Sequence, residues 1–510
     1  MARQTEFDVI VGGGGVAGTT TAVALQQLGL SILLVEPGLH DDRRLAGEVL
    51  HPPGVRGLAE LGLLGRLLPA PSARIEGFLI TDGSENLIHF PYDEDRTLRM
   101  DGLGIEHRLI RSRLLDAAKE LRGVTVLHGK RVTAVDQSDP SSVQVEVSSG
   151  KAGMHYRCRI LVAADGSQSR IGRAAGVVSR GRRISTMFGY RLSAEHLLER
   201  GYGQVVLGAP TPILAYPINS EEIRVLFDMP PEFGRSPRPE VWADHFAALP
   251  ARLRCEVEQV MAVQRGMSVV ARVSSPDRTS HHRLVLVGDA GGNCHPLTAS
   301  GMTRCVSDAL LLRDSLAEHP GNWPRALQVY QGQRCRPQAT RVVLADALRE
   351  AFCGRTPEAR VMRRGILVYC GASRDGRAAT MALLSTADGR PLALLREMVK
   401  VMMLGFLAHL RTPAPSGGRG MLATLHILKG FAARALQYGR QVFGGTPGVI
   451  AARRTDYDDS GHGQAHDAAE TPRNLPGRGL ASSTGCRTLP SRLTFRSQEA
   501  RATRASPPRH

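Results

Sequence analysis

The stretch from Phe7 to Glu36 constrains the fold of this chain more strongly than any other part of it. An apolar run leads into a glycine cluster, then an Ala- and Leu-rich segment, then a second apolar run that ends at Glu36. This order predicts a β-α-β unit. Gly13, Gly15 and Gly18 fit G-x-G-x-x-G. In that pattern the first glycine permits a tight turn, the second leaves room for a pyrophosphate, and the third lets the helix pack closely on the strand.

This unit predicts a dinucleotide site. The start of the helix would present free N–H groups to the phosphates. Glu36 lies 18 residues after Gly18, where an acid can accept hydrogen bonds from a ribose. The alternative is a glycine-rich loop in an unrelated α/β protein, and the unit by itself leaves open which dinucleotide binds.

Composition limits the kind of partner. The 510 residues leave room for two domains and a tail. The formal charge of +17 suggests nucleic-acid binding, but only five residues are lysines, and the arginines are dispersed without interleaved aromatic residues. We therefore expect no nucleic-acid partner, and attraction to an anionic membrane surface fits better.

Cysteine and histidine spacing predicts neither a disulfide framework nor a metal site. The eight cysteines are scattered without a C-x-x-C pair, and His281, His282 and His295 lack partners at ligand spacing. The first predicted strand begins almost at once, so we expect no signal peptide. No apolar run reaches the roughly 20 residues that span a bilayer. These observations favour a reduced protein that is cytoplasmic, or peripheral on the cytoplasmic side of a membrane.

Two further acidic turns follow buried strands. Asp165-Gly166 ends one predicted strand and Gly288-Asp289 ends another, after which the loop 293–302 leads into a predicted helix. An acid after a strand, followed by a glycine-rich loop and a helix start, can bind a polyol chain and direct a helix dipole at an anionic ring. Asp289 alone fits a helix N-cap equally well.

The rest of the chain divides into strand-like, helical and tail segments according to its hydrophobic pattern. A hairpin is predicted over 75–92, and strand-like runs recur between 184 and 275; together they can form a sheet that covers a substrate pocket. Residues 324–440 look mostly helical, and the apolar segment 394–410 includes charged residues, which fits a core helix or a helix in the membrane interface. After residue 451 large apolar residues become rare, and we expect a disordered, arginine-rich tail.

Three motifs together resemble those of FAD-dependent aromatic-hydroxylase-like proteins: the Gly13–Gly18 loop with Glu36, Asp165-Gly166, and Gly288-Asp289. More narrowly, the chain is similar to the squalene monooxygenase (squalene epoxidase) family. The segments that carry this resemblance are Gly47 to Gly54 for the family's G-E-x-L-x-P-G, Phe90 to Tyr92 for its I-P-Y strand, 288–303 for its G-D-A-x-x-x-x-H-P-L-T-G-G-G-M-T, and 367–394 before its membrane-binding helices. The likeness covers about residues 6–440.

The resemblance implies a fold class and a division into domains. We expect an α/β (α+β) protein in which a Rossmann-type FAD-binding domain is interleaved with a mixed-sheet substrate domain and followed by a helical region. The expected boundaries are 5–75, 100–183 and 280–330 for the FAD-binding domain, 76–99 and 184–279 for the substrate domain, 331–445 for a helical region that is a candidate for membrane association, and 451–510 for the tail.

The resemblance also implies roles for individual residues. Glu36 would bind the adenosine ribose, Asp289 the ribityl chain, and Met302 would lie by the isoalloxazine ring. Tyr92 would lie beside the flavin and shape the catalytic site. The full set expected to bind FAD is Gly13, Gly15, Val16, Ala17, Gly18, Glu36, Pro37, Arg44, Val49, Arg108, Asp165, Gly288, Asp289, Pro296, Gly301 and Met302.

The implied activity is that of an FAD-dependent monooxygenase. It would use O2 and NAD(P)H, the latter directly or through a reductase, to epoxidise or hydroxylate a hydrophobic squalene-like terpenoid or polyene through a flavin C4a-hydroperoxide. Such chemistry needs a dry, mostly apolar pocket. The alternatives are an aromatic or polyketide hydroxylase, an oxygen-independent isoprenoid reductase, and a degenerate flavoprotein that serves as a binding subunit. Ala299-Ser300 replaces two of the family's three glycines beside the flavin, which can alter flavin mobility or oxygen access.

Overall fold

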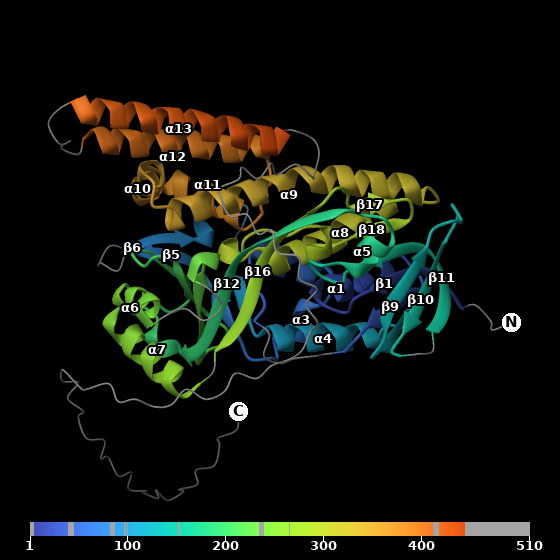
Figure 1. Cartoon of the computed structure of the whole chain (residues 1–510). Coiled ribbons are helices and arrows are strands. Elements are labelled where there is room, and N and C mark those ends of the chain that lie inside the picture. The colour runs from blue at the N-terminus through green and yellow to red at the C-terminus, as the bar shows by residue number, and fades with distance from the viewer. Residues whose placement is uncertain are drawn as a thin grey trace, which may run out of the picture. The chain divides into compact units, whose positions relative to one another are not determined.

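The computed structural model describes residues 5–38, 45–81, 87–95, 98, 100–150, 153–233, 239–264, 266–411 and 418–443. They lie within one compact unit, Met1–Ala451. The tail predicted for 451–510 falls outside the described residues. The α/β class is confirmed: two large sheets and a set of C-terminal helices make up this unit (Figure 1).

The first sheet is built around β1, which pairs in parallel with β2 on one side and β11 on the other. All of β2 and the second half of β1, Val9 to Gly12, are buried, as expected for strands covered on both faces. In sheet order the strands are β17 (Ser280–His281), β18 (Leu284–Leu286), β11 (Gly153–Ala163), β1 (Thr5–Gly12), β2 (Ile32–Glu36) and β8 (Val124–His128), with β10 (Val143–Ser148) and β9 (Arg131–Asp136) extending from β11.

The second sheet is mostly antiparallel and contains the predicted hairpin, in which β5 pairs with β6. The turn between these strands falls outside the described residues. In sheet order the strands are β16 (Met267–Pro276), β12 (Ser179–Ser193), β15 (Glu222–Met229), β14 (Ile213–Pro217), β13 (Tyr202–Val206), β5 (Gly77–Thr81) and β6 (Leu87–Pro91). A small third sheet joins β3 (Val49–Leu50), β7 (Gly102–Ile105) and β4 (Ser72–Ile75).

Helices cover both large sheets. Within the described ranges they are α1 (Val16–Gln26), α2 (Pro52–Glu60), α3 (Leu64–Leu67), α4 (His107–Lys119), α5 (Arg170–Ala174), α6 (Pro239–Ala247), α7 (Ala251–Val263), α8 (Gly301–Glu318), α9 (Trp323–Cys353), α10 (Pro357–Ala372), α11 (Arg374–Leu384), α12 (Pro391–Leu410) and α13 (Gly418–Phe443), with short 3-10 turns η1 (Tyr92–Glu94), η2 (Ala194–His196), η3 (Pro231–Phe233), η4 (Gly288–Gly291) and η5 (Pro296–Thr298). No helix among the described residues is long and apolar enough to cross a membrane.

The second sheet is covered by different helices on its two faces. Helices α6 and α7 pack on one face, where Leu253 and Val257 join a cluster with Phe227. The C-terminal helices pack on the other face, where Leu226 shares a cluster with Phe352. Figure 1 shows α6 and α7 below this sheet and α9 to α13 above it. The two faces therefore belong to two separate apolar cores.

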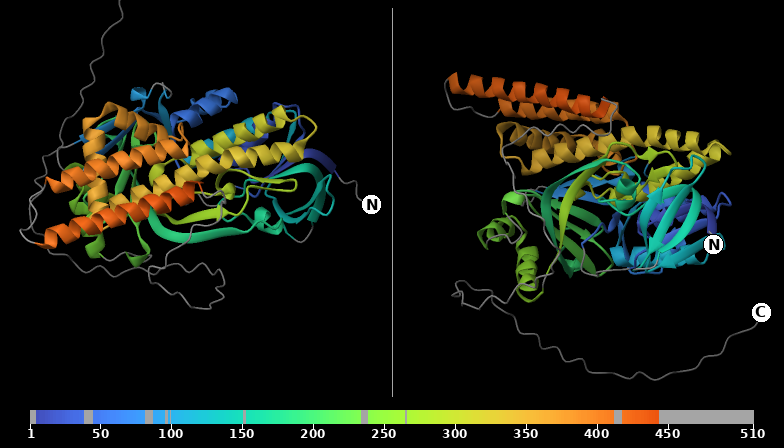
Figure 2. Two further views of the ribbon diagram at one scale, coloured as in Figure 1. Left: turned by 90° about the horizontal axis from the view of Figure 1, so that it is seen from above. Right: turned by 45° about the vertical axis from the view of Figure 1, so that its right-hand side comes forward.

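Helices α10 and α12 cross at two glycines. A Cβ at Gly365 would collide with the carbonyl oxygen of Val401, and one at Gly405 would collide with that of Val361. Both views in Figure 2 show α12 and α13 side by side as the outermost layer on this side of the unit. The glycines allow the backbones of α10 and α12 to touch.

Two local expectations differ from the structure. The sequence Pro-Pro-Gly at Pro52 to Gly54 predicts a turn, but α2 begins at Pro52, because the fixed φ of proline suits a first helical turn. Helices α6 and α7 were not expected among the strand-like runs of 184–275. The domain boundaries given above stay a proposal, which the membership of β5 and β6 in the second sheet supports.

Candidate functional site

The three glycine-containing motifs meet at one edge of the first sheet. A Cβ at Gly13 would lie 2.5 Å from the carbonyl oxygen of Ala164, the residue before Asp165. A Cβ at Gly288 would lie 2.7 Å from the Cβ of Ala17. Gly13 and Gly288 both have positive φ, +113° and +57°, which permits the sharp turns after β1 and β18. Segments far apart in the sequence therefore lie next to one another here, and the space beside them is the proposed cofactor groove.

The start of α1 fits a pyrophosphate. A Cβ at Gly18 would fall onto the carbonyl oxygen of Gly13, so this glycine is required for packing. A Cβ at Gly15 would meet nothing within 4 Å, so this side of the turn is open. The N-cap residue, Gly15, provides no side-chain cap, which leaves the N–H groups of Val16 and Ala17 directed at that space. These features fit the phosphate-binding role expected for the loop.

Glu36 is buried at the end of β2, where its carboxylate orders the adjacent turns. Oε2 accepts a hydrogen bond from the N–H of Gly14 at 2.5 Å, and Oε1 accepts one from Gly38 at 2.8 Å. Arg111 of α4 lies 3.4 Å from Oε1. A carboxylate oxygen has capacity for more than one donor, so both oxygens can also accept ribose hydroxyls.

The two acidic turn residues have different surroundings. Asp165 Oδ2 accepts hydrogen bonds from the N–H groups of Arg170 and Ile171, at 2.7 and 3.1 Å. Its side chain therefore helps to satisfy the first N–H groups of α5, and its part in FAD binding stays a prediction. Asp289 lies half-buried on η4, beside the start of α1.

A buried ionic network that the sequence did not reveal supports η4. Asp308 of α8 accepts hydrogen bonds from the N–H of Gly288 at 2.9 Å and from Nε of Arg334 at 3.0 Å. Arg334 also donates to the carbonyl oxygens of Gly288 and Gly291. Asp308 and Arg334 are fully buried. Because Arg334 is contributed by α9, no local sequence pattern could have placed it here.

A second unforeseen residue, His51, contacts the predicted Tyr92. Its Nε2 lies 3.0 Å from the carbonyl oxygen of Thr298, which can only accept, so the proton is on Nε2. Nδ1 then accepts from the Tyr92 hydroxyl at 2.6 Å. Burial lowers the pKa of His51 to about 4 and raises that of Tyr92 well above its ordinary value. Both side chains are thus held neutral near pH 7.

The loop before α8 carries a strained residue. Ala299 has φ +50°, a left-handed conformation that is unusual for a residue with a Cβ, and it occupies a position where the resembled family has glycine. Met302, in the first turn of α8, is buried and faces Gly47, whose Cβ would lie 3.5 Å from its Cγ. A Cβ at Gly301 would meet nothing within 4 Å, so the start of α8 is also open.

The other predicted residues lie on several different elements. Val49 is buried in β3, Pro37 follows β2, Arg108 lies exposed in the first turn of α4, and Pro296 opens η5. Arg44 lies outside the described residues. The neighbouring His107 reaches the carbonyl oxygen of Gly47 at 2.8 Å, which brings the start of α4 to the Gly47-Glu48 segment.

Glu48 joins this segment to the second sheet. Its carboxylate accepts two hydrogen bonds from Arg224 of β15, at 2.9 and 2.8 Å, and one from Tyr216 at 3.3 Å. Both partners of the ion pair are only 2% exposed. A buried, bidentate ion pair of this kind fixes the relative orientation of the two side chains as well as the distance between them.

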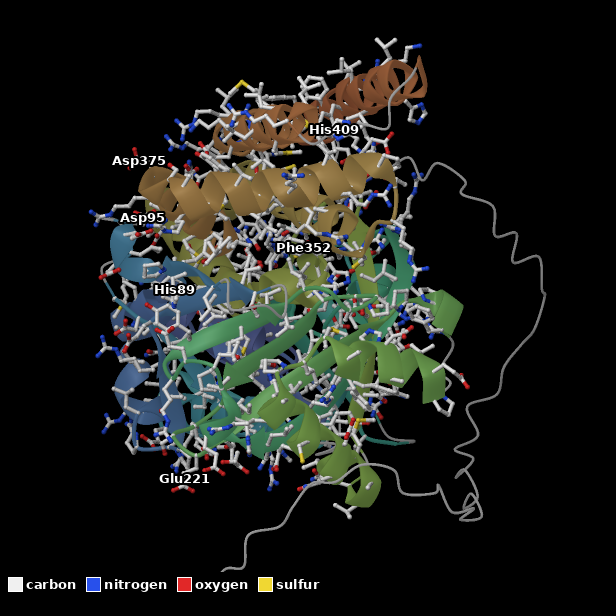
Figure 3. All side chains as sticks on the ribbon, turned by 90° about the vertical axis from the view of Figure 1, so that its left-hand side faces the viewer. His89, Asp95, Glu221, Phe352, Asp375 and His409 are labelled. Atoms are coloured by element: carbon white, nitrogen blue, oxygen red, sulfur yellow. The ribbon has the colours of Figure 1, made fainter. Side chains whose placement is uncertain are left out.

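Tyr92 also borders a large apolar cluster. Phe90, Leu226 and Leu297 belong to it, and it continues through Phe352 into the C-terminal helices. Figure 3 shows Phe352 between the second sheet and the helices above it, with His409 farther out on α12. Within the described residues no group of three or more His, Cys, Asp or Glu side chains is placed to hold a metal.

Comparison with known sequences identifies two matching families. The squalene epoxidase family profile matches residues 157–417, and the pyridine nucleotide-disulphide oxidoreductase profile matches residues 7–195. Squalene monooxygenase from Mus musculus is 27% identical over 409 residues, which cover 78% of this chain and 71% of the mouse protein. Mitochondrial squalene epoxidase 2 from Arabidopsis thaliana is 30% identical over 429 residues, covering 80% of this chain and 72% of the plant protein.

Solved structures share the fold. The p-nitrophenol 4-monooxygenase from Pseudomonas putida has a TM-score of 0.62 at 18% identity, covering 75% of this chain and 99% of its own. A variant of HpxO from Klebsiella pneumoniae, solved with FAD, has the same TM-score and coverages at 20% identity. The chain belongs to the squalene epoxidase family and is an FAD-dependent monooxygenase.

Proposed function

We propose that this enzyme epoxidises a squalene-like terpenoid or polyene, with FAD lying along the groove from Glu36 to Met302. The observation that carries the substrate assignment is the apolar cluster that borders Tyr92 and extends over one face of the second sheet to the C-terminal helices. A hydrocarbon chain needs such walls, because burying apolar surface drives its binding. Two of the charged groups on this side, Glu48 and Arg224, are paired with each other.

The chain's own residues prepare the site for this reaction. FAD, when bound, supplies the redox chemistry by which one atom of O2 reaches the substrate. The open start of α1 would hold the pyrophosphate, and the open start of α8 would direct its partial positive charge toward the flavin end. His51 holds the Tyr92 hydroxyl, so that neither group adds a titrating proton to an apolar pocket. The surrounding apolar side chains exclude water.

Product analysis tests the substrate class. Full-length protein with FAD, NADPH and an added flavin reductase is given squalene, other polyenes and phenolic compounds under ¹⁸O2, and products are identified by mass spectrometry. We expect a mono-epoxide of a polyene that contains one labelled oxygen. Labelled phenols alone would replace the terpenoid assignment by the aromatic one. Omitting the reductase shows whether NADPH reduces the enzyme directly, and we expect the reductase to be required.

Flavin binding tests the proposed cofactor groove. Asp289→Ala removes a charged acceptor of the ribityl chain worth about 1.5–3 kcal/mol, so we expect FAD affinity to fall by roughly 10- to 150-fold. Asp277→Ala, at a half-buried acid outside the groove, is the matched control and keeps full affinity. Unchanged flavin fluorescence titrations for Asp289→Ala would remove Asp289 from the proposed site.

We also propose that α12 and α13 rest on the membrane surface from which the substrate is taken. Exposed apolar residues recur at helical spacing along both helices: Val399, Met403, Leu407 and Leu410 on α12, and Leu425, Leu428, Leu436 and Phe443 on α13. Such stripes favour insertion into the interface of a bilayer. This outer layer adjoins the apolar cluster that leads to Tyr92.

Vesicle flotation tests this surface. Replacing Met403 and Leu407 by serine should release the protein from vesicles of phosphatidylcholine with phosphatidylglycerol, because each lost side chain removes about 1.5–3 kcal/mol of apolar burial. Val263→Ser is the control, since Val263 is 88% exposed at the end of α7. Equal flotation of all variants would count against the proposed membrane face.

A further inference from the structure

The loop that precedes α8 contains a buried histidine whose role is separate from that of His51. His295 is 2% exposed, and its Nδ1 accepts a hydrogen bond from the N–H of Leu297 at 3.2 Å. A backbone N–H can only donate, so the ring proton of the neutral imidazole is on Nε2. One side of the ring therefore caps the turn η5 of its own loop.

The other side of the ring faces the second sheet. Nε2 lies 3.2 Å from Oδ2 of Asp228 in β15, and Asp228 is also 2% exposed. The two groups are close but not aligned: within the described residues neither Nε2 of His295 nor Oδ1 of Asp228 makes a hydrogen bond. Burying two polar groups in this way costs free energy unless each is partnered by the other. Packing alone therefore does not explain why these two polar groups are buried side by side.

We infer that Asp228 and His295 are positioning residues that set the conformation of the flavin-side loop from the substrate sheet. β15 lies in the sheet whose inner face forms the proposed substrate wall, and His295 caps the turn that ends in the strained Ala299. A shift of β15 would move Asp228, turn the imidazole and release η5. This inference rests on the proposed placement of the flavin beside Met302, and it makes the substrate wall and the flavin loop one coupled unit.

Two substitutions separate this role from turn capping. His295→Asn keeps a side-chain acceptor for the Leu297 N–H, because asparagine is a good cap, but it is too short to reach Asp228. Asp228→Val places a residue that favours β-strands at this position and removes the link. The control is Thr211→Val: the Thr211 hydroxyl donates to the carbonyl oxygen of Asp228, so its loss weakens the same strand without touching the pair.

Hydrogen–deuterium exchange of the full-length apoprotein reads out the loop without the cofactor. The Ala299 N–H, which donates to the carbonyl oxygen of Pro296 at 2.8 Å, should exchange about tenfold faster in both His295→Asn and Asp228→Val, because each variant removes the close contact between the imidazole and the Asp228 carboxylate. The double variant should exchange no faster than either single variant, because contacting residues are not additive. Thr211→Val should match the natural protein.

Flavin binding supplies the second readout. Both variants should bind FAD about tenfold more weakly and change the visible spectrum of the bound flavin, and the control should do neither. Faster exchange in His295→Asn alone, with Asp228→Val unchanged, would reduce His295 to a turn cap and overturn the inference. If Asp228→Val does not fold, additive effects of His295→Asn and Asp228→Asn would overturn it equally. Failure of the natural protein to bind FAD would refute the proposed function and leave the exchange result intact.

Discussion

The two ends of the proposed cofactor groove are built in different ways. At the adenosine end, the backbone of one short segment, with three glycines and Glu36, forms nearly all of the site. At the flavin end, side chains from four distant regions meet: His51, Tyr92, the loop before α8, and the Asp308–Arg334 pair beneath η4. A motif can encode the first kind of site, whereas only a folded protein creates the second. The flavin end should therefore respond more strongly to single side-chain changes.

The largest expected effect is that of Asp308→Ala. This change leaves buried guanidinium groups of Arg334 and Arg304 without their anion, and loss of one partner of a buried pair costs about 3–5 kcal/mol. Urea unfolding should show a loss of that size together with loss of FAD. Asp314→Ala, on the same helix but in an exposed pair, should cost less than about 1 kcal/mol. Similar unfolding curves for the two variants would contradict a dominant role for the network.

The next effect depends on pH. His51 stays neutral in the fold down to about pH 4, whereas in the unfolded chain it takes up a proton near pH 6.5. The unfolded state therefore binds more protons between these values, and stability that is complete above pH 6.5 is lost as the pH falls toward 4. The loss is about 3 kcal/mol by the usual conversion. His51→Gln, which can make both hydrogen bonds without titrating, should lack this component. If the natural protein and His51→Gln lost stability in parallel from pH 7 to pH 4, the proposed contribution of His51 would be refuted.

At the adenosine end, alanine substitutions at two glycines should change different properties: Gly18→Ala the stability of the fold, and Gly15→Ala the affinity for FAD. Gly18→Ala forces a Cβ onto the carbonyl oxygen of Gly13 and should destabilise the fold by about 1–3 kcal/mol. Gly15→Ala meets nothing within 4 Å, so it should leave unfolding of the apoprotein unchanged while weakening FAD binding. Thermal unfolding and flavin titration of both variants check this. Equal loss of stability in both would mean that the loop is not open at Gly15.

The smallest expected effect is a gain in the free energy of unfolding. Ala299→Gly removes the strain of a left-handed alanine, about 1 kcal/mol, although the freer unfolded chain offsets part of it. His282→Gly, at an exposed position with φ +53°, is the control away from the groove. Both should raise the free energy of unfolding slightly, and only Ala299→Gly should change flavin fluorescence. An altered flavin signal in both would contradict a local role for Ala299.

The contrast between the two ends also explains what sequence reasoning could and could not predict. Gly13 to Glu36 are adjacent in the chain and depend on backbone geometry, so their pattern predicted both fold and location. The strands of the second sheet were predicted from strand-like runs, but α6 and α7 were missed because both helices are short and only weakly amphipathic. His51, Asp308 and Arg334 carry no pattern, since each acts on a partner that only tertiary folding brings near.

The crossing of Gly365 and Gly405 has a consequence at the far side of the molecule. Backbones that touch without intervening side chains cannot roll on each other, because any rotation would bring side chains into the contact. The rotation of α12 about its own axis is thereby fixed from inside the protein. The two glycines therefore determine the direction in which Val399, Met403 and Leu407 face outward, although they have no side chains of their own. As long as this crossing is kept, the outer residues of α12 can change without altering the orientation of the helix. The exposed surface can therefore adapt to different surroundings.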